Sequence, residues 1–133
     1  MKYIIYFFSV LIPLLIIDGV WLFFVAKNFY MPKISHLLGA PNILAIIAFY
    51  LLYSFGFCFL LLNPSIVSGE KYLDMFLKAF IFGAVAYGTY DLTNQALLKN
   101  WPVIITIIDI FWGAFLTGIV GVISKYIINM LNK

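Results

Sequence analysis

The sequence GAVAYGTYDLTNQALLKNWPVIITIIDIFWG, from Gly83 to Gly113, decides the fold class of this chain. It places two acidic residues, Asp91 and Asp109, inside apolar runs that are each long enough to cross a membrane. A charged side chain at the centre of a bilayer costs roughly 2.5 to 3.5 kcal/mol on insertion scales, so it normally faces the protein interior and has a partner. The stretch therefore predicts a membrane protein with a polar interior.

The composition of the whole chain supports this class. Of the 133 residues, 65% are hydrophobic and 10% are charged, whereas soluble domains are about 45–50% apolar and about 25% charged. The net charge of +3 comes from lysines that stand singly near the ends of apolar runs, so we expect no nucleic-acid partner. Cys58 is the only cysteine, which excludes an intramolecular disulfide.

Four apolar runs predict an all-α integral membrane fold, an antiparallel bundle of four transmembrane helices. We expect a single membrane domain over residues 1–133, with helices at about 3–26, 42–62, 72–98 and 102–126. Each run reaches roughly the 20 residues needed to cross the hydrocarbon core, and tight turns favour antiparallel neighbours. The longest connection, Lys27 to Pro41, is amphipathic and suits the headgroup layer, with Pro32 starting and Gly39 ending a short helix.

The first run also has features of a secretory signal, because Lys2 precedes an apolar core. It is too long for a typical signal, contains Asp18 and lacks a clean cleavage site, so we expect a retained helix. Pro13 frees the carbonyl of Ser9 and predicts a kink. With the N-terminus inside, five lysines lie on the cytoplasmic side and three outside, which favours cytoplasmic N- and C-termini.

Polar residues from all four runs fall at one depth. Asp18, Tyr50, Asp91 and Asp109 each lie about seven or eight residues from the same end of the bundle, which at 1.5 Å per residue is roughly 10–12 Å below one membrane face. Helical phase adds further polar and aromatic residues to the same inward faces: Trp21, Tyr53, Tyr87, Asn94 and Trp112. We therefore expect one polar layer built by four helices.

This layer has a structural and a functional interpretation. Polar residues between membrane helices can serve packing alone, and their hydrogen bonds average about 0.6 kcal/mol. For any single tyrosine or tryptophan we favour that interpretation. Three buried carboxyl groups without a single lysine or arginine inside the membrane to neutralise them favour function instead, because they must hold protons or share a cation.

The available chemistry is narrow. The only histidine, His36, lies in the predicted connection, and the chain has no zinc, iron or phosphate-loop motif, so we expect no metal and no cofactor. A hard cation held by Asp18, Asp91 and Asp109 with Asn94 is chemically allowed, but the spacing gives no specific signal for it. Acid–base chemistry by buried carboxyl groups remains.

Several motifs resemble the family known as domain of unknown function 2177, a set of small bacterial membrane proteins. They are Asp18-x-x-Trp21-Leu22, Phe49-Tyr50-Leu51-Leu52-Tyr53, Tyr87-Gly88-Thr89-Tyr90-Asp91-Leu92-Thr93-Asn94, Trp101-Pro102 and Asp109-x-x-Trp112-Gly113. The resemblance implies a four-span protein of the bacterial cytoplasmic membrane and names no activity. It also implies a neighbourhood of lipid-modifying enzymes, which favours a lipid substrate. Lysines replace some expected arginines, which concerns only the topology.

Three functions follow as hypotheses. The first is an enzyme, or an essential subunit of one, that acts on a lipid or other apolar substrate entering from the bilayer. Its catalytic residues would be Asp91 and Asp109 as an acid–base pair and Asp18 as a third carboxyl, and Tyr50, Tyr87, Asn94, Trp21, Trp112 and Tyr53 would bind the substrate. The second is a non-catalytic scaffold for lipid or a membrane partner. The third is a small proton- or cation-coupled carrier, for which four helices give little room without a homodimer.

Overall fold

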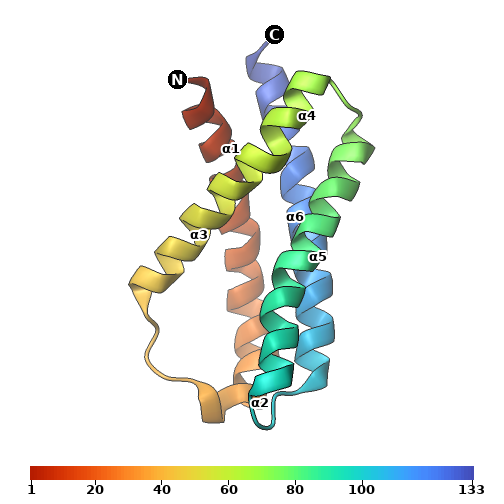
Figure 1. Cartoon of the computed structure of the whole chain (residues 1–133). Coiled ribbons are helices and arrows are strands. Elements are labelled where there is room, and N and C mark those ends of the chain that lie inside the picture. Colours follow the sequence, from red (N-terminus) through yellow and green to blue (C-terminus); the bar gives the residue numbers. More distant parts are fainter.

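The computed structural model describes all residues, 1–133, and contains helices only. The first continuous helical rod comprises α1 (Lys2–Trp21), the π-helix η1 (Leu22–Tyr30), α2 (Met31–Ile34) and the 3₁₀ turn η2 (Ser35–Leu37). The second comprises α3 (Ile43–Phe57), the π-helix η3 (Cys58–Leu62) and α4 (Asn63–Ser68). The third and fourth are α5 (Tyr72–Leu97) and α6 (Val103–Leu131). Figure 1 shows them as an antiparallel bundle with both termini at one end, which confirms the predicted four-helix fold.

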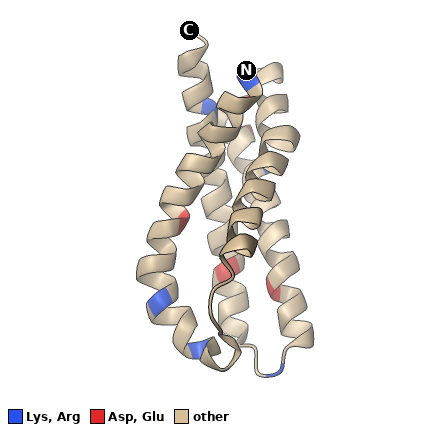
Figure 2. Cartoon of the chain, turned by 90° about the vertical axis from the view of Figure 1, so that its left-hand side faces the viewer, with Lys and Arg blue, Asp and Glu red and all other residues tan.

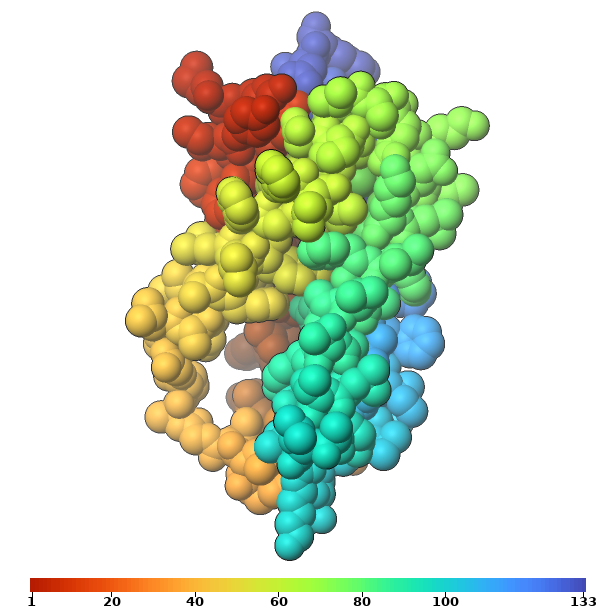
Figure 3. Space-filling model, viewed as in Figure 1, coloured from red at the N-terminus to blue at the C-terminus, as the bar shows by residue number.

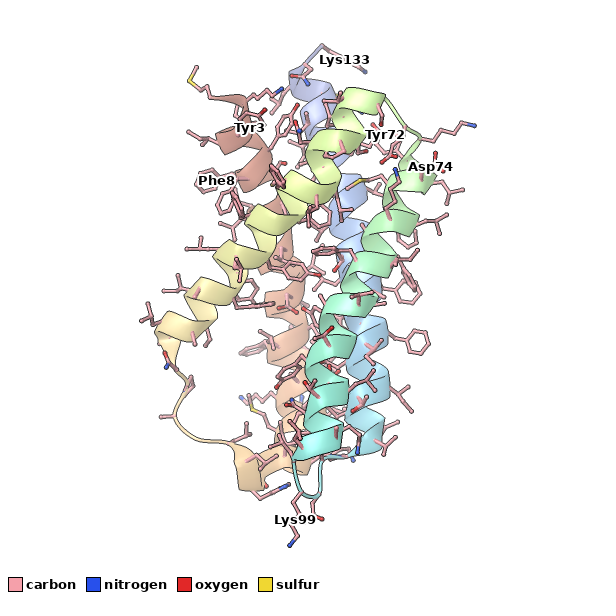
Figure 4. All side chains as sticks on the ribbon, viewed as in Figure 1. Tyr3, Phe8, Tyr72, Asp74, Lys99 and Lys133 are labelled. Carbon is pink, nitrogen blue, oxygen red and sulfur yellow. The ribbon has the colours of Figure 1, made fainter.

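The two ends of the bundle carry different parts of the chain. Lys133, Tyr72 and Asp74 lie at the end that holds the termini, and Lys99 lies at the opposite tip, in the turn between α5 and α6 (Figure 4). Asn100 in this turn adopts φ 61°, the left-handed conformation that asparagine tolerates better than most residues. The two longest helices can therefore reverse within a few residues and pack along their whole length.

Both π-helical stretches precede a proline. The pyrrolidine ring of a proline inside a helix collides with the carbonyl four residues earlier, which is Asn28 for Pro32 and Leu60 for Pro64. These carbonyls lie inside η1 and η3, respectively. Widening the helix by one residue per turn accommodates the ring without ending the helix.

Two predicted boundaries are wrong for this reason. The segment from Lys27 to Pro41 is not a connection with a separate short helix, because the first rod stays helical as far as Leu37. The second helix does not end at Asn63-Pro64 but continues to Ser68, where Gly69 at φ 65° ends it. The sequence predicts a helix end at Asn63-Pro64 and the start of a separate short helix at Pro32. In both places the preceding π-helix lets the helix continue through the proline.

Pro13 acts differently, inside a helix that stays α-helical throughout. The carbonyl of Ser9, which has lost its normal donor, accepts a hydrogen bond of 2.8 Å from the Ser124 hydroxyl of α6. The predicted free carbonyl is therefore satisfied by a neighbouring helix. This contact also fixes α1 against α6 near the end that holds the termini.

Three rods are long and apolar enough to cross a membrane by themselves: Lys2–Leu37, Ile43–Ser68 and Val103–Leu131. The remaining helix, α5, has 26 residues and so has the length, but Asp74, Lys78 and Asp91 make it more polar. It packs along α6, and of its charged residues only Asp91 is buried, whereas Asp74 and Lys78 are exposed. The long apolar helices, together with the many large hydrophobic side chains exposed on their surface, identify a membrane protein.

The closest packing joins α5 to α6 through glycines. A Cβ added at Gly83 would overlap the Gly113 carbonyl and Thr117, and one added at Gly113 would overlap the Tyr87 ring. These two glycines therefore allow close approach of the helix backbones. By contrast, Figure 1 shows α3 leaning away from the bundle at its N-terminal end.

Lys125 departs from the sequence-based prediction. Predicted to lie near the end of the fourth span as a topology determinant, it is instead 3% exposed inside α6, which continues to Leu131. Its ammonium group donates to the carbonyl and hydroxyl oxygens of Ser65, at 3.0 and 2.8 Å. The bundle thus holds a buried lysine, although at the end of the chain termini and away from the cavity described below.

Candidate functional site

Asp18 is the carboxyl group of the polar layer whose two oxygens both accept hydrogen bonds. It lies on α1 and is 5% exposed. Its Oδ2 accepts a hydrogen bond of 2.6 Å from the Tyr50 hydroxyl of α3, and its Oδ1 accepts one of 3.0 Å from the Trp112 indole of α6. Three helices therefore meet at this side chain, at the level that the sequence predicted, and both of its oxygens are held in place.

Two tryptophans form the wall next to Asp18. The rings of Trp21 and Trp112 are stacked, with centroids 4.0 Å apart and an interplanar angle of 6°. The Tyr30 ring meets Trp21 edge-on, with centroids 6.0 Å apart. Because Tyr30 belongs to η1, the π-helical extension of the first rod supplies part of this wall.

A cavity of about 470 Å³ opens beside these residues. This volume is within the 300–1,000 Å³ typical of small-molecule sites. The eleven lining residues come from all four rods and are Asp18, Trp21, Leu22, Tyr30, Ile46, Phe49, Tyr50, Tyr87, Tyr90, Asp109 and Trp112. Figure 3 shows the hollow between α3 with its preceding connection and α5. The leaning of α3 thus leaves the side of the bundle open.

Asp109 and Asp91 form the second acidic part of the site. Asp109 lines the cavity, whereas Asp91 is 0% exposed and lies behind the wall. The two carboxyl groups interact, and Asp109 also interacts with the Tyr30 hydroxyl. Neither oxygen of Asp91 has a hydrogen-bond partner in the standard geometry of a deprotonated carboxylate. Two neighbouring carboxyl groups that share one proton would satisfy each other.

The structure brings six of the nine predicted site residues to the cavity and leaves three outside it. The six are Asp18, Asp109, Tyr50, Tyr87, Trp21 and Trp112. Of the others, Asp91 is behind Asp109, and Asn94 is half-buried beside Tyr90. The Tyr53 hydroxyl is 2.7 Å from that of Thr117, which itself donates to the Gly113 carbonyl, so Tyr53 links α3 to α6.

Sequence reasoning missed several lining residues. Tyr30 was assigned to a headgroup connection, and its place in the cavity depends on the helix continuing past Lys27. Tyr90, Phe49, Leu22 and Ile46 lie beside recognised positions on their helices and line the mouth. The signal that could have identified Tyr30 is its spacing of nine residues from Trp21. In an α-helix nine residues make two and a half turns, which puts the two side chains on opposite faces. In a wider π-helix they make fewer turns, which brings Tyr30 toward the face of Trp21.

The charges of the site have one sign. None of the cavity-lining residues is a lysine, and the molecule's single ion pair, Lys78 with Glu70, lies elsewhere. Figure 2 shows acidic positions within the bundle and lysines toward its ends. No group of three or more His, Cys, Asp or Glu side chains gathers closely enough to hold a metal ion. The site therefore offers carboxyl groups, hydroxyl groups and aromatic rings.

Comparison with protein families agrees with this picture. Residues 3–126 match the model of the family described as "Predicted membrane protein (DUF2177)". The chain belongs to this family. No curated protein and no solved structure matches it. The match reaches all four helices of this DUF2177 protein, ending within α6, and includes every residue of the cavity.

Proposed function

We propose that this DUF2177 protein binds a lipid or another apolar molecule in the cavity and takes part in acid–base chemistry on it, as an enzyme or as an essential subunit of one. The observation that supports this most strongly is a cavity at the carboxyl layer that is open at the side of the bundle. We propose the bacterial cytoplasmic membrane as its location, with both termini in the cytoplasm, because four lysines against three favour that orientation when the buried Lys125 is left out.

The lining of the cavity suits an apolar molecule. Nine of its eleven lining residues are hydrophobic, and Leu22, Ile46 and Phe49 at its mouth are themselves exposed on the bundle surface. In a bilayer these side chains contact acyl chains, so a lipid chain can pass from the bilayer into the cavity without crossing a polar surface. Each CH₂ that leaves water for such a site contributes about 0.8 kcal/mol, but a chain that comes from the bilayer gains less. The polar groups must therefore provide selectivity.

The carboxyl groups divide into two roles. Asp18 is held by two donors and presents a fixed acceptor. Asp109 faces the cavity and is the group that can exchange a proton with a bound molecule, with Asp91 behind it as the positioning residue. Burial of Asp91 means that it acts on a ligand only through Asp109. Tyr50 and Tyr87 line the cavity and are placed to orient the ligand.

Mass spectrometry of total lipids from a deletion strain tests the proposal. The strain is restored with wild type, with Asp109→Asn, or with Asp74→Asn, a matched loss of an exposed carboxyl outside the site. We expect a lipid species to be lost or to accumulate on deletion, and to return to normal with wild type and Asp74→Asn only. Identical lipids in all four strains, with equal amounts of protein in the membrane, would contradict a lipid-processing function.

A further inference from the structure

The cavity combines negative charge with a mostly aromatic wall. Seven of its eleven lining residues are aromatic and two are carboxyl groups, and none is basic. Aromatic faces attract cations by about 2 kcal/mol or more in desolvated sites, and cages of aromatic rings recognise quaternary ammonium groups. The wall therefore favours a ligand with a positive charge inside an apolar body.

A second observation concerns Tyr30. Its side chain lines the cavity and is 9% exposed, and its buried hydroxyl, although close to Asp109, makes no hydrogen bond of standard geometry. An unpaired buried polar group costs about 1–3 kcal/mol. The Tyr30 oxygen lies beside Asp109, so the N–H of a protonated amine placed between them could bond to both groups. A quaternary ammonium has no N–H and would be held by the aromatic wall and the charge of Asp109 alone.

From these two observations we infer that the ligand of this cavity is a cationic amphiphile, an amine or quaternary ammonium with an apolar tail. Asp109 supplies the counter-charge, and the aromatic wall surrounds the cationic head. An anionic ligand is disfavoured because it would meet two carboxyl groups and no lysine. This inference rests on the proposed function, since it names the ligand class of the same cavity.

Matched probes separate charge from apolarity. The full chain, purified in the nonionic detergent dodecyl maltoside, is titrated with octyltrimethylammonium, with its neutral isostere 2,2-dimethyldecane and with octyl sulfate. The fluorescence of Trp21 and Trp112 reports on binding, because both rings line the cavity. We expect the ammonium to bind at least tenfold more tightly than the neutral isostere, and the sulfate to bind least.

Variants test the origin of that preference. Asp109→Asn should remove the tenfold difference, Asp109→Glu should retain it, and Asp74→Asn should leave it unchanged. Equal binding of the ammonium and the neutral isostere, or tighter binding of the sulfate, would overturn the cationic inference and leave an apolar cavity as proposed. Absence of binding by all three probes to folded protein would count against both the inference and the proposed function.

Discussion

At the scale of single residues, Asp18 is the side chain that joins the most elements of the site. It accepts hydrogen bonds from α3 and α6 while lying on α1. A carboxylate accepts at both oxygens, whereas an amide has one acceptor and one donor group. Its chemical identity, and not its size, therefore decides whether the three helices can meet as they do.

Replacing Asp18 tests that statement. Asp18→Leu removes both acceptors and leaves the indole N–H of the half-buried Trp112 unpaired, so we expect a loss of about 1–3 kcal/mol in the free energy of unfolding. Tyr50→Phe removes one bond and leaves the other, and should cost only about 0.6 kcal/mol. Unfolding in micelles measures both. An Asp18→Leu protein as stable as wild type would show that these bonds do not hold the bundle together.

Gly113 gives a second test at this scale. A Cβ there would overlap the Tyr87 ring, so Gly113→Ala must separate α5 from α6 and should cost about 1–3 kcal/mol. Gly56 of α3 is the matched control, because nothing lies within 4 Å of an added Cβ. Gly56→Ala should stabilise the protein by about 0.4–1 kcal/mol through the unfolded state. Thermal unfolding should therefore shift in opposite directions for the two variants.

Glu70 provides a prediction about pH outside the membrane-spanning helices. The hydrogen bond from Lys78 lowers the pKa of Glu70, and the charges of Lys78 and Lys125 act in the same direction. Because the pKa is lower in the folded state, this pair stabilises the protein above the ordinary glutamate pKa of about 4.3. That stability is lost as the pH falls through the lowered value. Glu70→Gln should thus flatten the stability profile between about pH 5 and 3, and an unchanged profile would exclude the effect.

At the scale of elements, prolines determine the shape of the rods. Pro32 and Pro64 follow π-helical stretches, and Pro13 depends on Ser124 to satisfy the Ser9 carbonyl. The sequence predicted that Ser9 would lose its donor, because that follows from covalent structure alone. The sequence could not predict that the Ser124 hydroxyl would take the place of that donor. Ser9 and Ser124 are 115 positions apart, and only the packing of α1 on α6 brings them together.

A double-mutant cycle isolates this contact. Ser124→Ala should cost about 1 kcal/mol in wild type, because the Ser9 carbonyl loses its donor. In a Pro13→Ala background the backbone N–H of residue 13 can bond to that carbonyl, so the same Ser124→Ala change should cost less. Equal costs in both backgrounds, measured by unfolding in micelles, would show that Ser124 acts through its own helix alone.

At the scale of the whole molecule, the sequence could predict the number of helices and the depth of the polar layer, but it could not predict the cavity. Four apolar runs fix the number of helices, and equal distances from helix ends fix the level at which Asp18, Tyr50 and Trp112 meet. The cavity depends on the leaning of α3 and on the extension of the first rod to Tyr30. Both result from packing and from π-turns, which leave no periodic signal in the sequence.

The same distinction, between what helical periodicity predicts and what packing decides, applies to the positions of Asp91 and Asp109. Helical phase places Asp91 and Asp109 on inward faces, and this much the sequence could predict. It could not show that Asp109 lines the cavity while Asp91 is fully buried, because a rotation of α5 by a few tens of degrees would exchange a lining position for one behind the wall. Tyr53 and Asn94 lie outside the cavity for the same reason.

The measurement that tests the central claim most directly is photo-crosslinking in a bilayer that contains a lipid with a diazirine in its acyl chain. Peptide mass spectrometry then locates the labelled residues. We predict labelling of Asp18 and Trp112, which line the cavity, with Asp18 only 5% exposed. Labels confined to outward-facing residues such as Ile81, Val85 and Phe111 would show that no acyl chain enters the cavity, and would contradict the account.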